Sequence, residues 1–310
     1  MIQAHQLGKQ FLEHWAVKDV SFQIQQGEVV CLLGLDGAGK STLLALLAGA
    51  IAPTEGEIYI QEKELWQSPA ALRAPIGYLP QTMPLSPEET VRETLTFRAR
   101  LSLKRVDAKE AVQQEITAFG LEAYQGQLVQ NLSAGQKKRL ALAASFVGRP
   151  KILLLDDPFL ELDHQGQLAL EKRIAQAAET SAIVFSARDV LLAAKILTRA
   201  LVLRDGRLAG TWTQEKEEKN VCRVRVRNRG AEKSFASSGE FQSVERLAQV
   251  EADTTELRLV GKAGTDVRER AYIWAAKHQL TLLGLSQETR TKEEALMDLL
   301  QSTAQGEVAQ

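Results

Sequence analysis

A glycine-rich loop at residues 34–41 dictates the fold class of this 310-residue chain. Its sequence, Gly-Leu-Asp-Gly-Ala-Gly-Lys-Ser, fits the phosphate-loop pattern G-x-x-x-x-G-K-[ST] between an apolar strand, Val29 to Leu33, and an apolar helix starting near Ser41. Glycines let backbone N–H groups point at phosphate oxygens, and a helix N-terminus adds positive potential. The pattern predicts a nucleotide-binding α/β fold in which Lys40 reaches the β and γ phosphates and the Ser41 hydroxyl binds Mg²⁺.

A second apolar segment ends in two acidic residues. Ile152 to Leu155 has the composition of a buried strand, and Asp156 and Asp157 follow it directly. Carboxylate oxygens are ligands that Mg²⁺ accepts when it accompanies a substrate phosphate. This segment is therefore predicted to form the second half of the nucleotide site.

The segment Leu132-Ser133-Ala134-Gly135-Gln136 lies between these two halves. With it, residues 1–212 resemble the ATP-binding cassette (ABC) family, whose signature is L-S-G-G-Q and whose other motifs occur here in the same order. The resemblance implies a P-loop NTPase cassette with a helical subdomain at about 86–145, ATP and Mg²⁺ as ligands, and ATPase activity. The residues that it predicts to contact ATP are Phe11, Gly34, Asp36, Gly37, Ala38, Gly39, Lys40, Ser41, Thr42, Ser133, Gly135 and Gln136.

The resemblance also implies individual roles. Phe11 stands where the family places an aromatic that stacks on adenine, and Leu160 to Asp163 matches the loop that crosses to a partner cassette. Gln81 matches the glutamine that senses Mg²⁺ and the membrane part of the transporter. The implied metal ligands are Ser41, Gln81 and Asp156, and the implied catalytic residues are Gln81, Asp157 and Arg188.

Two of the catalytic residues depart from the family's usual types. Asp157 replaces a glutamate and Arg188 replaces a histidine, whereas Ala134 in the signature and Asp36 in the phosphate loop are milder departures. The aspartate carboxylate retreats by about 1.5 Å, and misplacing a catalytic group by about 1 Å can cost about a hundredfold in rate. Arginine keeps a positive charge but cannot present a neutral ring nitrogen. We expect ATP binding to survive and hydrolysis to be weak; family drift with full activity is the alternative.

Composition changes after residue 213, which predicts a second domain. The expected division is a cassette at 1–213, a charged linker at 214–220, a small α+β domain at 221–302 and a tail at 303–310. Strands are expected at Val221 to Arg227, Glu256 to Val260 and Thr281 to Leu285, a helix from Asp266 to His278 capped by Thr265, and a last helix opened by a capping box at Thr291. The alternating arginines of the first strand fit a solvated outer face of a sheet; the alternative is a surface that binds anionic lipid or nucleic acid.

Bulk properties narrow the function classes. The 38 basic and 39 acidic residues nearly cancel, so charge gives no support to a nucleic-acid partner. Cys31 and Cys222 are expected to be small buried hydrophobes, not a disulfide or metal pair. The longest apolar run, Leu43 to Ala52, is about half the length of a membrane span. A cytoplasmic protein, peripheral on the inner face of a membrane, is expected, with the pore in another polypeptide.

Thr90 to Leu95 resembles a stretch found in cassettes of the exporter (ABC-2-like) branch. The prediction is therefore the ATP-binding subunit of a membrane exporter, with an integral membrane permease and a second cassette as partners. A heterodimer is favoured, because Asp157 and Arg188 act on the chain's own ATP while the nearly intact signature serves the opposite one. The alternatives are a non-transport switch acting on ribosomes or DNA, and a catalytically silent cassette kept for assembly.

Overall fold

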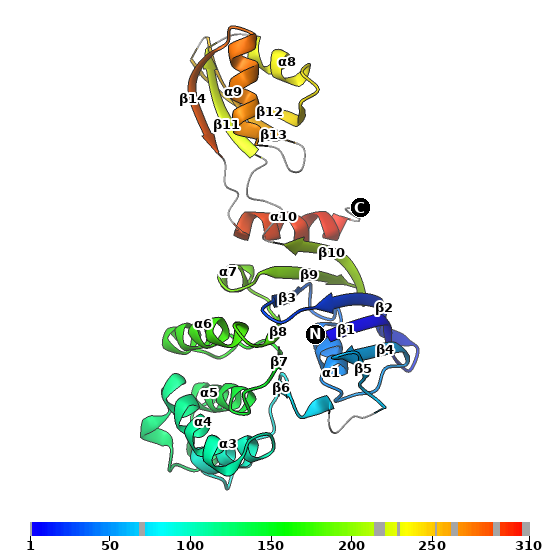
Figure 1. Ribbon diagram of the computed structural model, residues 1–310, viewed down its shortest axis with the longest axis vertical. Coiled ribbons are helices and arrows are strands. Elements are labelled where there is room, and N and C mark those ends of the chain that lie inside the picture. The colour runs from blue at the N-terminus through cyan, green and yellow to red at the C-terminus, as the bar shows by residue number, and fades with distance from the viewer. Residues whose placement is uncertain are drawn as a thin grey trace. The chain divides into compact units, whose positions relative to one another are not determined.

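The computed structural model describes residues 2–67, 72–213, 221–227, 230–251, 253–261, 266–287 and 292–305. The chain divides into two compact units, which we call the cassette unit (Met1–Trp212 with Leu296–Gln310) and the C-terminal unit (Thr213–Ala295) (Figure 1). The sequence placed the whole last helix in the small domain, but in the structure that helix belongs from Leu296 onward to the cassette unit. The predicted linker at 214–220 and the tail residues 306–310 lie outside the described residues.

A four-stranded antiparallel sheet begins the cassette unit. Its spatial order is β2-β1-β4-β5, and its long strands bury one face, with the alternation of buried and exposed residues interrupted at the register shifts of β1. The strands are β1 (Ile2–Phe11), β2 (His14–Ile24), β4 (Glu55–Ile60) and β5 (Lys63–Glu64).

A six-stranded sheet forms the second layer, in the order β10-β9-β3-β8-β7-β6. The pairs from β9 to β6 along this order are parallel. Its central strands are apolar and buried along their whole length, as strands covered on both faces must be. The strands are β3 (Val29–Leu33), β6 (Ile76–Leu79), β7 (Ile152–Leu155), β8 (Ala182–Ser186), β9 (Arg199–Arg204) and β10 (Arg207–Thr213).

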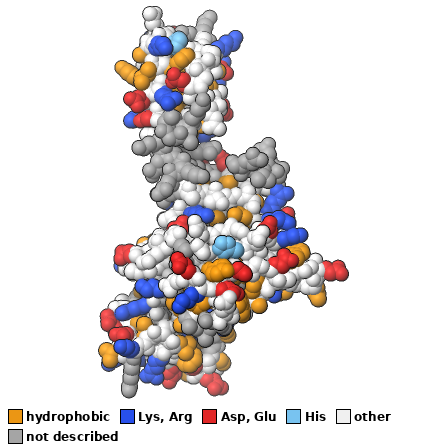
Figure 2. Space-filling model, turned by 45° about the vertical axis from the view of Figure 1, so that its right-hand side comes forward, with side chains coloured by type: hydrophobic (Ala, Val, Ile, Leu, Met, Phe, Trp, Pro, Cys, Tyr) orange, Lys and Arg blue, Asp and Glu red, His pale blue; other side chains and the backbone are white. Residues whose placement is uncertain are grey.

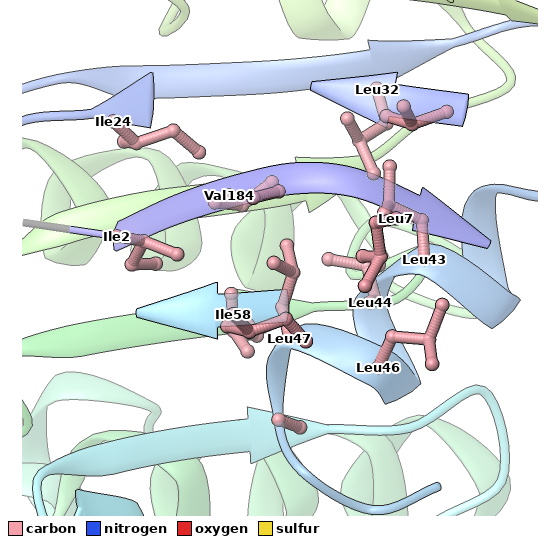
Figure 3. Packing of buried hydrophobic residues seen from close by; sticks show 14 of the residues in the cluster. Ile2, Leu7, Ile24, Leu32, Leu43, Leu44, Leu46, Leu47, Ile58 and Val184 are labelled. Carbon is pink, nitrogen blue, oxygen red and sulfur yellow. The ribbon is translucent and has the colours of Figure 1, made fainter. Parts of the chain in front are cut away.

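Helix α1 (Lys40–Leu47) lies between the two sheets (Figure 3). Its leucines contact strands of both layers, and Leu43, Leu44, Leu46 and Leu47 are all 0% exposed. Removing each such side chain from water contributes about 2 kcal/mol. The core therefore fixes α1, and with it the loop that precedes α1.

The remaining helices of the cassette cover the large sheet or gather at its far end. Helices α3 and α4 pack with α5 in the region for which the resemblance predicts a helical subdomain (Figure 1). Thr90 opens α3 with a capping box to Glu93. The helices are α3 (Val91–Arg100), α4 (Arg105–Ala118), α5 (Ala134–Phe146), α6 (His164–Ala178), α7 (Val190–Ala194), the C-terminal α10 (Lys292–Gln305), and two 3₁₀ turns at Glu122–Tyr124 and Val129–Asn131.

The C-terminal unit is a four-stranded antiparallel sheet with the order β12-β13-β11-β14. Its β-α-β-β-α-β sequence of elements and this order give the ferredoxin-like, split β-α-β arrangement. The first and last strands are neighbours, with Cys222 opposite Gln287. The elements are β11 (Val221–Arg227), α8 (Ala231–Ala236), β12 (Phe241–Glu251), β13 (Thr254–Gly261), α9 (Val267–Lys277) and β14 (Thr281–Gln287).

Several local predictions for this unit can be compared with the structure. Strand β11 alternates as predicted, but α8 and β12 were not predicted. Asp266 caps α9 by accepting bonds from two backbone N–H groups, while Thr265 and Thr291 lie outside the described residues. His278 is exposed, and its ring lies 4.0 Å from that of Trp274, centroid to centroid, at the end of α9.

The exposed sheet face of the C-terminal unit carries balanced charge. The arginines of β11 point outward, and Arg223 and Arg227 lie 3.9 and 3.8 Å from Glu256 and Asp253. Acidic and basic side chains are interspersed over the surface visible in Figure 2. This arrangement favours the solvated outer face over an anion-binding strand.

Two further predictions concern the whole chain. Cys31 and Cys222 are both buried and are not joined by a disulfide, as expected. Among the described helices, none combines the length and the apolar composition that crossing a lipid bilayer requires.

Candidate functional site

The carboxyl ends of parallel strands bring the predicted site together. The phosphate loop follows β3, Gln81 follows β6, the acidic pair follows β7 and Arg188 follows β8, and these strands end at one edge of the same sheet. A cleft of about 300 Å³ lies at this edge. It is lined by Ala16, Asp36, Gly37, Gly39, Lys40, Ser41, Thr42, Gln81, Asp156, Asp157, Ser186 and Arg188.

The phosphate loop has a shape that side chains at its key glycines would destroy. Gly39, at the N-terminus of α1, has a φ of 100°, and a Cβ atom there would lie 2.2 Å from the carbonyl oxygen of Ala16. Gly34 has a φ of 145°, and its Cβ would lie 2.3 Å from the carbonyl oxygen of Leu203. Both positions need glycine, because only glycine adopts such φ values without strain and without a side chain to clash.

Lys40 curls back over the loop that carries it. Its Nζ donates to the carbonyl oxygens of Gly34 and Leu35 at 2.7 and 2.9 Å. Partial burial lowers the pKa of Lys40, while Asp36 and Asp157 oppose that shift. The ammonium group therefore sits inside the loop where phosphate oxygens would enter.

Asp156 is buried, with only 3% of its surface exposed. Its Oδ1 accepts a 2.6 Å hydrogen bond from the Ser186 hydroxyl, and the same hydroxyl accepts a bond from the Asp157 N–H at 2.8 Å. Ser186 thus holds both acidic residues from the end of the neighbouring strand. Ser186 is not among the residues predicted from the sequence, although its place two residues before Arg188 could have indicated it.

Asp157 has an unusual backbone conformation. Its φ is 47°, in the left-handed region that few residues other than glycine adopt and that is enriched at functional sites. Its carbonyl oxygen accepts a 3.0 Å bond from Lys138 Nζ, and its carboxylate Oδ2 accepts a 2.8 Å bond from Arg188 Nε. The N–H, the carbonyl and the carboxylate of this residue are therefore all held.

Arg188 forms ion pairs with both Asp36 and Asp157, the two acidic residues near the phosphate loop that also depart from the family pattern. Besides its bond to Asp157, its Nη1 lies 3.4 Å from Oδ2 of Asp36. In the sequence Asp36, Asp157 and Arg188 are three separate departures from the family pattern. In the structure they form one ion-pair cluster at the mouth of the cleft.

Some predicted residues do not line this cleft. Phe11 is 48% exposed at the end of β1, where Lys9 Nζ lies 5.3 Å from its ring centre. Ser133 and Gln136 form a capping box that begins α5, with Gly135 beside them, and they stay a prediction for contact with a nucleotide on another cassette. Gly34 and Ala38 line the outer flank of the phosphate loop.

That outer flank borders a second cavity of about 330 Å³. Asp36, Gly37 and Arg188 line both cavities, and Leu300 and Thr303 of α10 line the second one. A hydrogen bond from Arg204 to the carbonyl oxygen of Thr303 holds this part of α10 in place. The sequence offered no indication of this contact, because these residues are distant along the chain.

The cleft fits ATP with Mg²⁺. The cradle around Gly39 is free of side chains, and Lys40 supplies positive charge for phosphate oxygens. The Ser41 hydroxyl, the Gln81 amide and the Asp156 carboxylate provide the oxygen donors that Mg²⁺ prefers.

Comparison with known proteins agrees with this geometry. The family model "ABC transporter" matches residues 17–160. The ABC transporter ATP-binding protein YxlF of Bacillus subtilis is 34% identical over 220 residues, which cover 70% of this chain and 72% of that protein. The lipopolysaccharide export ATP-binding protein LptB of Acidithiobacillus ferridurans is 30% identical over 67% of this chain and 88% of its own.

Import systems are also among the relatives. The spermidine/putrescine import ATP-binding protein PotA of Trichodesmium erythraeum is 31% identical over 67% of this chain. The chain spans only 55% of the length of that protein. Similarity to these relatives therefore does not decide the direction of transport.

Solved structures show the same cassette. An ATP-binding subunit of an ABC transporter matches with a TM-score of 0.66 at 27% identity, over 69% of this chain and 90% of the other. The dimeric cassette MJ0796 bound to ADP and phosphate, in a post-hydrolysis state, matches with a TM-score of 0.60 at 26% identity, over 69% and 98%. The predicted α/β P-loop fold is confirmed, and the chain belongs to the ABC transporter family as an ATP-binding subunit with the fold of an ABC ATPase.

Proposed function

We propose that this chain is the ATP-binding subunit of a membrane exporter and that its own nucleotide site holds ATP but hydrolyses it slowly. It would act on the cytoplasmic face of the membrane and move a separate permease. The export direction is supported by the exporter-like segment Thr90 to Leu95.

Each half of the site has a distinct role in this proposal. Lys40, Ser41 and Asp156 hold ATP–Mg²⁺, and Gln81 links the metal to the permease. Mg²⁺, when bound, neutralises charge on the phosphate oxygens. Ser133 and Gly135 contact the ATP of a second cassette, and ATP favours the closed pair because the γ-phosphate contacts exist only there.

The observation that carries slow hydrolysis is the 2.8 Å bond from Arg188 Nε to the Asp157 carboxylate. A carboxylate must be free to accept a hydrogen bond from water if it is to orient that water for attack. Here one carboxylate oxygen already accepts a hydrogen bond from the Arg188 guanidinium. Both the shorter side chain of Asp157 and its bond to Arg188 are therefore expected to lower the rate of ATP hydrolysis.

This defect is confined to one composite site. Asp157 and Arg188 face the chain's own phosphate loop across one cleft, whereas Ser133 and Gly135 begin α5 outside that cleft. A homodimer would carry the same ion pair in both sites. A partner cassette with the usual glutamate and histidine would supply one working site, so we favour a heterodimer.

The deciding measurement is ATP turnover by the purified chain beside the double variant Asp157→Glu with Arg188→His. We expect turnover to rise by about a hundredfold in the variant, because a correctly placed carboxylate and a titratable ring are both restored. Arg207→His, at an exposed arginine on β10, is the matched control and should leave turnover unchanged. Fast turnover by the unaltered chain, with no gain in the double variant, would refute slow hydrolysis.

The export direction needs its own test. The permease that co-purifies with the chain from membranes would be reconstituted with it in vesicles. ATP-driven release of cargo from the ATP-containing side supports export. Uptake toward that side, or recovery of ribosomal proteins without a membrane partner, would contradict it.

A further inference from the structure

Helix α5 begins at the signature segment and places two consecutive basic residues, Lys138 and Arg139, one turn further along. The capping box between Ser133 and Gln136 fixes the first turn of this helix. A displacement of Ser133 is therefore transmitted to Lys138, because a capped helix moves as a rigid body over one turn.

Lys138 is a buried lysine, with 8% of its surface exposed. Burial lowers the pKa of its ammonium group, while the nearby carboxylates of Asp157 and Glu161 oppose the shift. An apolar side chain of the same length would fill this space without the cost of desolvating a charge. The specific use made of the ammonium group is its 3.0 Å bond to the carbonyl oxygen of Asp157.

The carbonyl group of Asp157 takes part in a second hydrogen bond that fixes the loop after the cleft. It also accepts the N–H of Leu160 at 3.2 Å and so begins the turn that leaves the cleft. Asp157 itself holds a left-handed backbone conformation with a φ of 47°. Such a conformation persists only where the surroundings impose it, and Lys138 and Ser186 bind the two sides of this residue.

Arg139 holds the far end of the same loop. Its Nη2 donates to Oδ2 of Asp163 at 2.7 Å, and Asp163 in turn caps α6 through the N–H of Gly166. Adjacent residues of α5 thus bind both ends of the loop from Asp157 to Asp163. A movement of α5 would therefore act on both ends of this loop.

We propose that Lys138 is a positioning residue that couples the signature segment of this chain to the carboxylate of Asp157. Contact between Ser133 and the nucleotide of a second cassette shifts α5, and Lys138 carries that shift to the backbone of Asp157. Each composite site thereby sets the geometry of the other. The coupling rests on the proposed function, because it requires a pair of cassettes that share their nucleotides.

The first test measures the local bond without any turnover. Lys138→Met keeps the length of the side chain and removes its charge and its hydrogen-bond donor. Lys138→Arg keeps the charge and a donor. Lys137→Met, on the same helix, is the matched control. Hydrogen exchange of the Asp157 and Leu160 amides should become about tenfold faster in Lys138→Met, the loss expected for one charge-assisted bond. It should stay unchanged in Lys137→Met and return toward the original rate in Lys138→Arg.

The second test measures coupling in the Asp157→Glu, Arg188→His background, where the carbonyl of residue 157 remains available to Lys138. Lys138→Met should lower kcat about tenfold with KM changed less than about twofold, since a small displacement of the carboxylate affects the reaction and not nucleotide binding. Ser133→Ala should lower kcat on its own but add little in the presence of Lys138→Met, because contacting groups on one path are non-additive. With Lys137→Met the effect of Ser133→Ala should remain complete.

The outcomes separate the coupling from the proposed function. If the Asp157→Glu, Arg188→His variant shows no turnover, the two substitutions do not explain slow hydrolysis and the proposed function fails. Hydrogen exchange of the amides still decides whether Lys138 holds Asp157. Unchanged amide exchange, or additive effects of Ser133→Ala and Lys138→Met, overturns the coupling. A common fall in Tm and in ATP affinity, without rescue by Lys138→Arg, assigns Lys138 to folding alone and also overturns it.

Discussion

The cassette unit and the C-terminal unit stabilise their cores in different ways. The cassette buries charged side chains: Glu115, Lys138 and Asp156 are 2%, 8% and 3% exposed. In the described part of the C-terminal unit, the buried residues are apolar apart from two threonines, and its arginines lie outside with acidic neighbours. Buried charge costs free energy unless each group is bound. The cassette retains such groups beside its cleft and between its helices. Their positions therefore indicate residues that serve a function other than stabilising the fold.

Lys40→Ala should produce the largest effect and distinguish the two units most directly. We expect ATP affinity to fall by about a hundredfold or more, because the loop loses the ammonium group that its own carbonyls hold in place. Calorimetry of ATP–Mg²⁺ binding measures this loss. Lys195→Ala, at an exposed lysine paired with Glu171, is the control and should bind normally. Unchanged affinity in Lys40→Ala would remove the nucleotide site from this cleft.

The ion pair of the buried Glu115 with the partly buried Arg173 tests whether a buried charge in the cassette needs its partner. Arg173 Nε lies 3.0 Å from both carboxylate oxygens, and its guanidinium lies 4.9 Å from the Phe146 ring centre. Glu115→Gln should lower the free energy of unfolding by about 3 kcal/mol, because it leaves Arg173 without its counter-charge.

Urea unfolding measures that loss, and the double variant Glu115→Leu with Arg173→Met is the informative comparison. It should recover most of the stability, because an apolar pair can replace a buried ion pair. A double variant as unstable as Glu115→Gln would show that the pair is needed for more than mutual compensation.

Gly210→Val tests the assignment of α10 to the cassette unit. A Cβ atom at Gly210 would lie 3.0 Å from Leu299 Cδ1 and 3.2 Å from Thr303 Cγ2. Overpacking of this kind costs about 1–3 kcal/mol, and limited proteolysis should cut α10 faster. Gly126→Ala, where nothing lies within 4 Å of an added Cβ, is the control. Equal proteolysis of Gly210→Val and the unaltered chain would contradict this packing.

The pair of Asp163 and Arg139 should give a smaller, pH-dependent effect. Bonds from Arg139 and from the Gly166 N–H lower the pKa of Asp163. The folded pKa is below the unfolded value of about 3.9, so the stabilisation is complete above that pH and is lost as pH falls through the folded pKa. The stability difference between the unaltered chain and Asp163→Asn should therefore be constant above about pH 5 and shrink in acid. A difference that grows in acid has the wrong sign for this pair.

Arg225→Gln should have the smallest effect. Arg225 lies on the exposed face of the sheet, opposite Glu256 and Gly284. Substitutions at such surfaces usually change stability by less than about 0.5 kcal/mol. A loss above about 1 kcal/mol in urea unfolding would show that this face is packed and that the contrast between the units is incomplete.

Much of the cassette was predictable because its local and distant determinants agree. The glycine loop, the apolar strand before it and the leucines of α1 all predict one strand–loop–helix unit, and the structure contains that unit. The acidic pair after Leu155 was predicted to form the second half of the nucleotide site, and in the structure parallel strands bring it to the same sheet edge as the phosphate loop.

What the sequence did not reveal depends on contacts between distant segments. No pattern in residues 130–160 shows that Lys138 reaches the carbonyl of Asp157, because that bond follows from how α5 packs on β7 and its loop. The contact of α10 with the cassette is equally non-local. Helix α8 and strand β12 were missed for a local reason, because α8 is only six residues long and the pairing of β12 contains register shifts, so neither segment has a regular apolar period.

The neighbouring first and last strands of the C-terminal unit have a consequence for how this protein could acquire or lose parts. Because Cys222 lies opposite Gln287, the chain enters and leaves that sheet at two points about 5 Å apart. A domain whose termini are this close can be inserted into a host chain without separating the host's flanking segments. The position between β10 and α10 is therefore suited to the insertion of a small domain. A gene could exchange one such domain for another there, and the chain would still continue into α10 beside the phosphate loop.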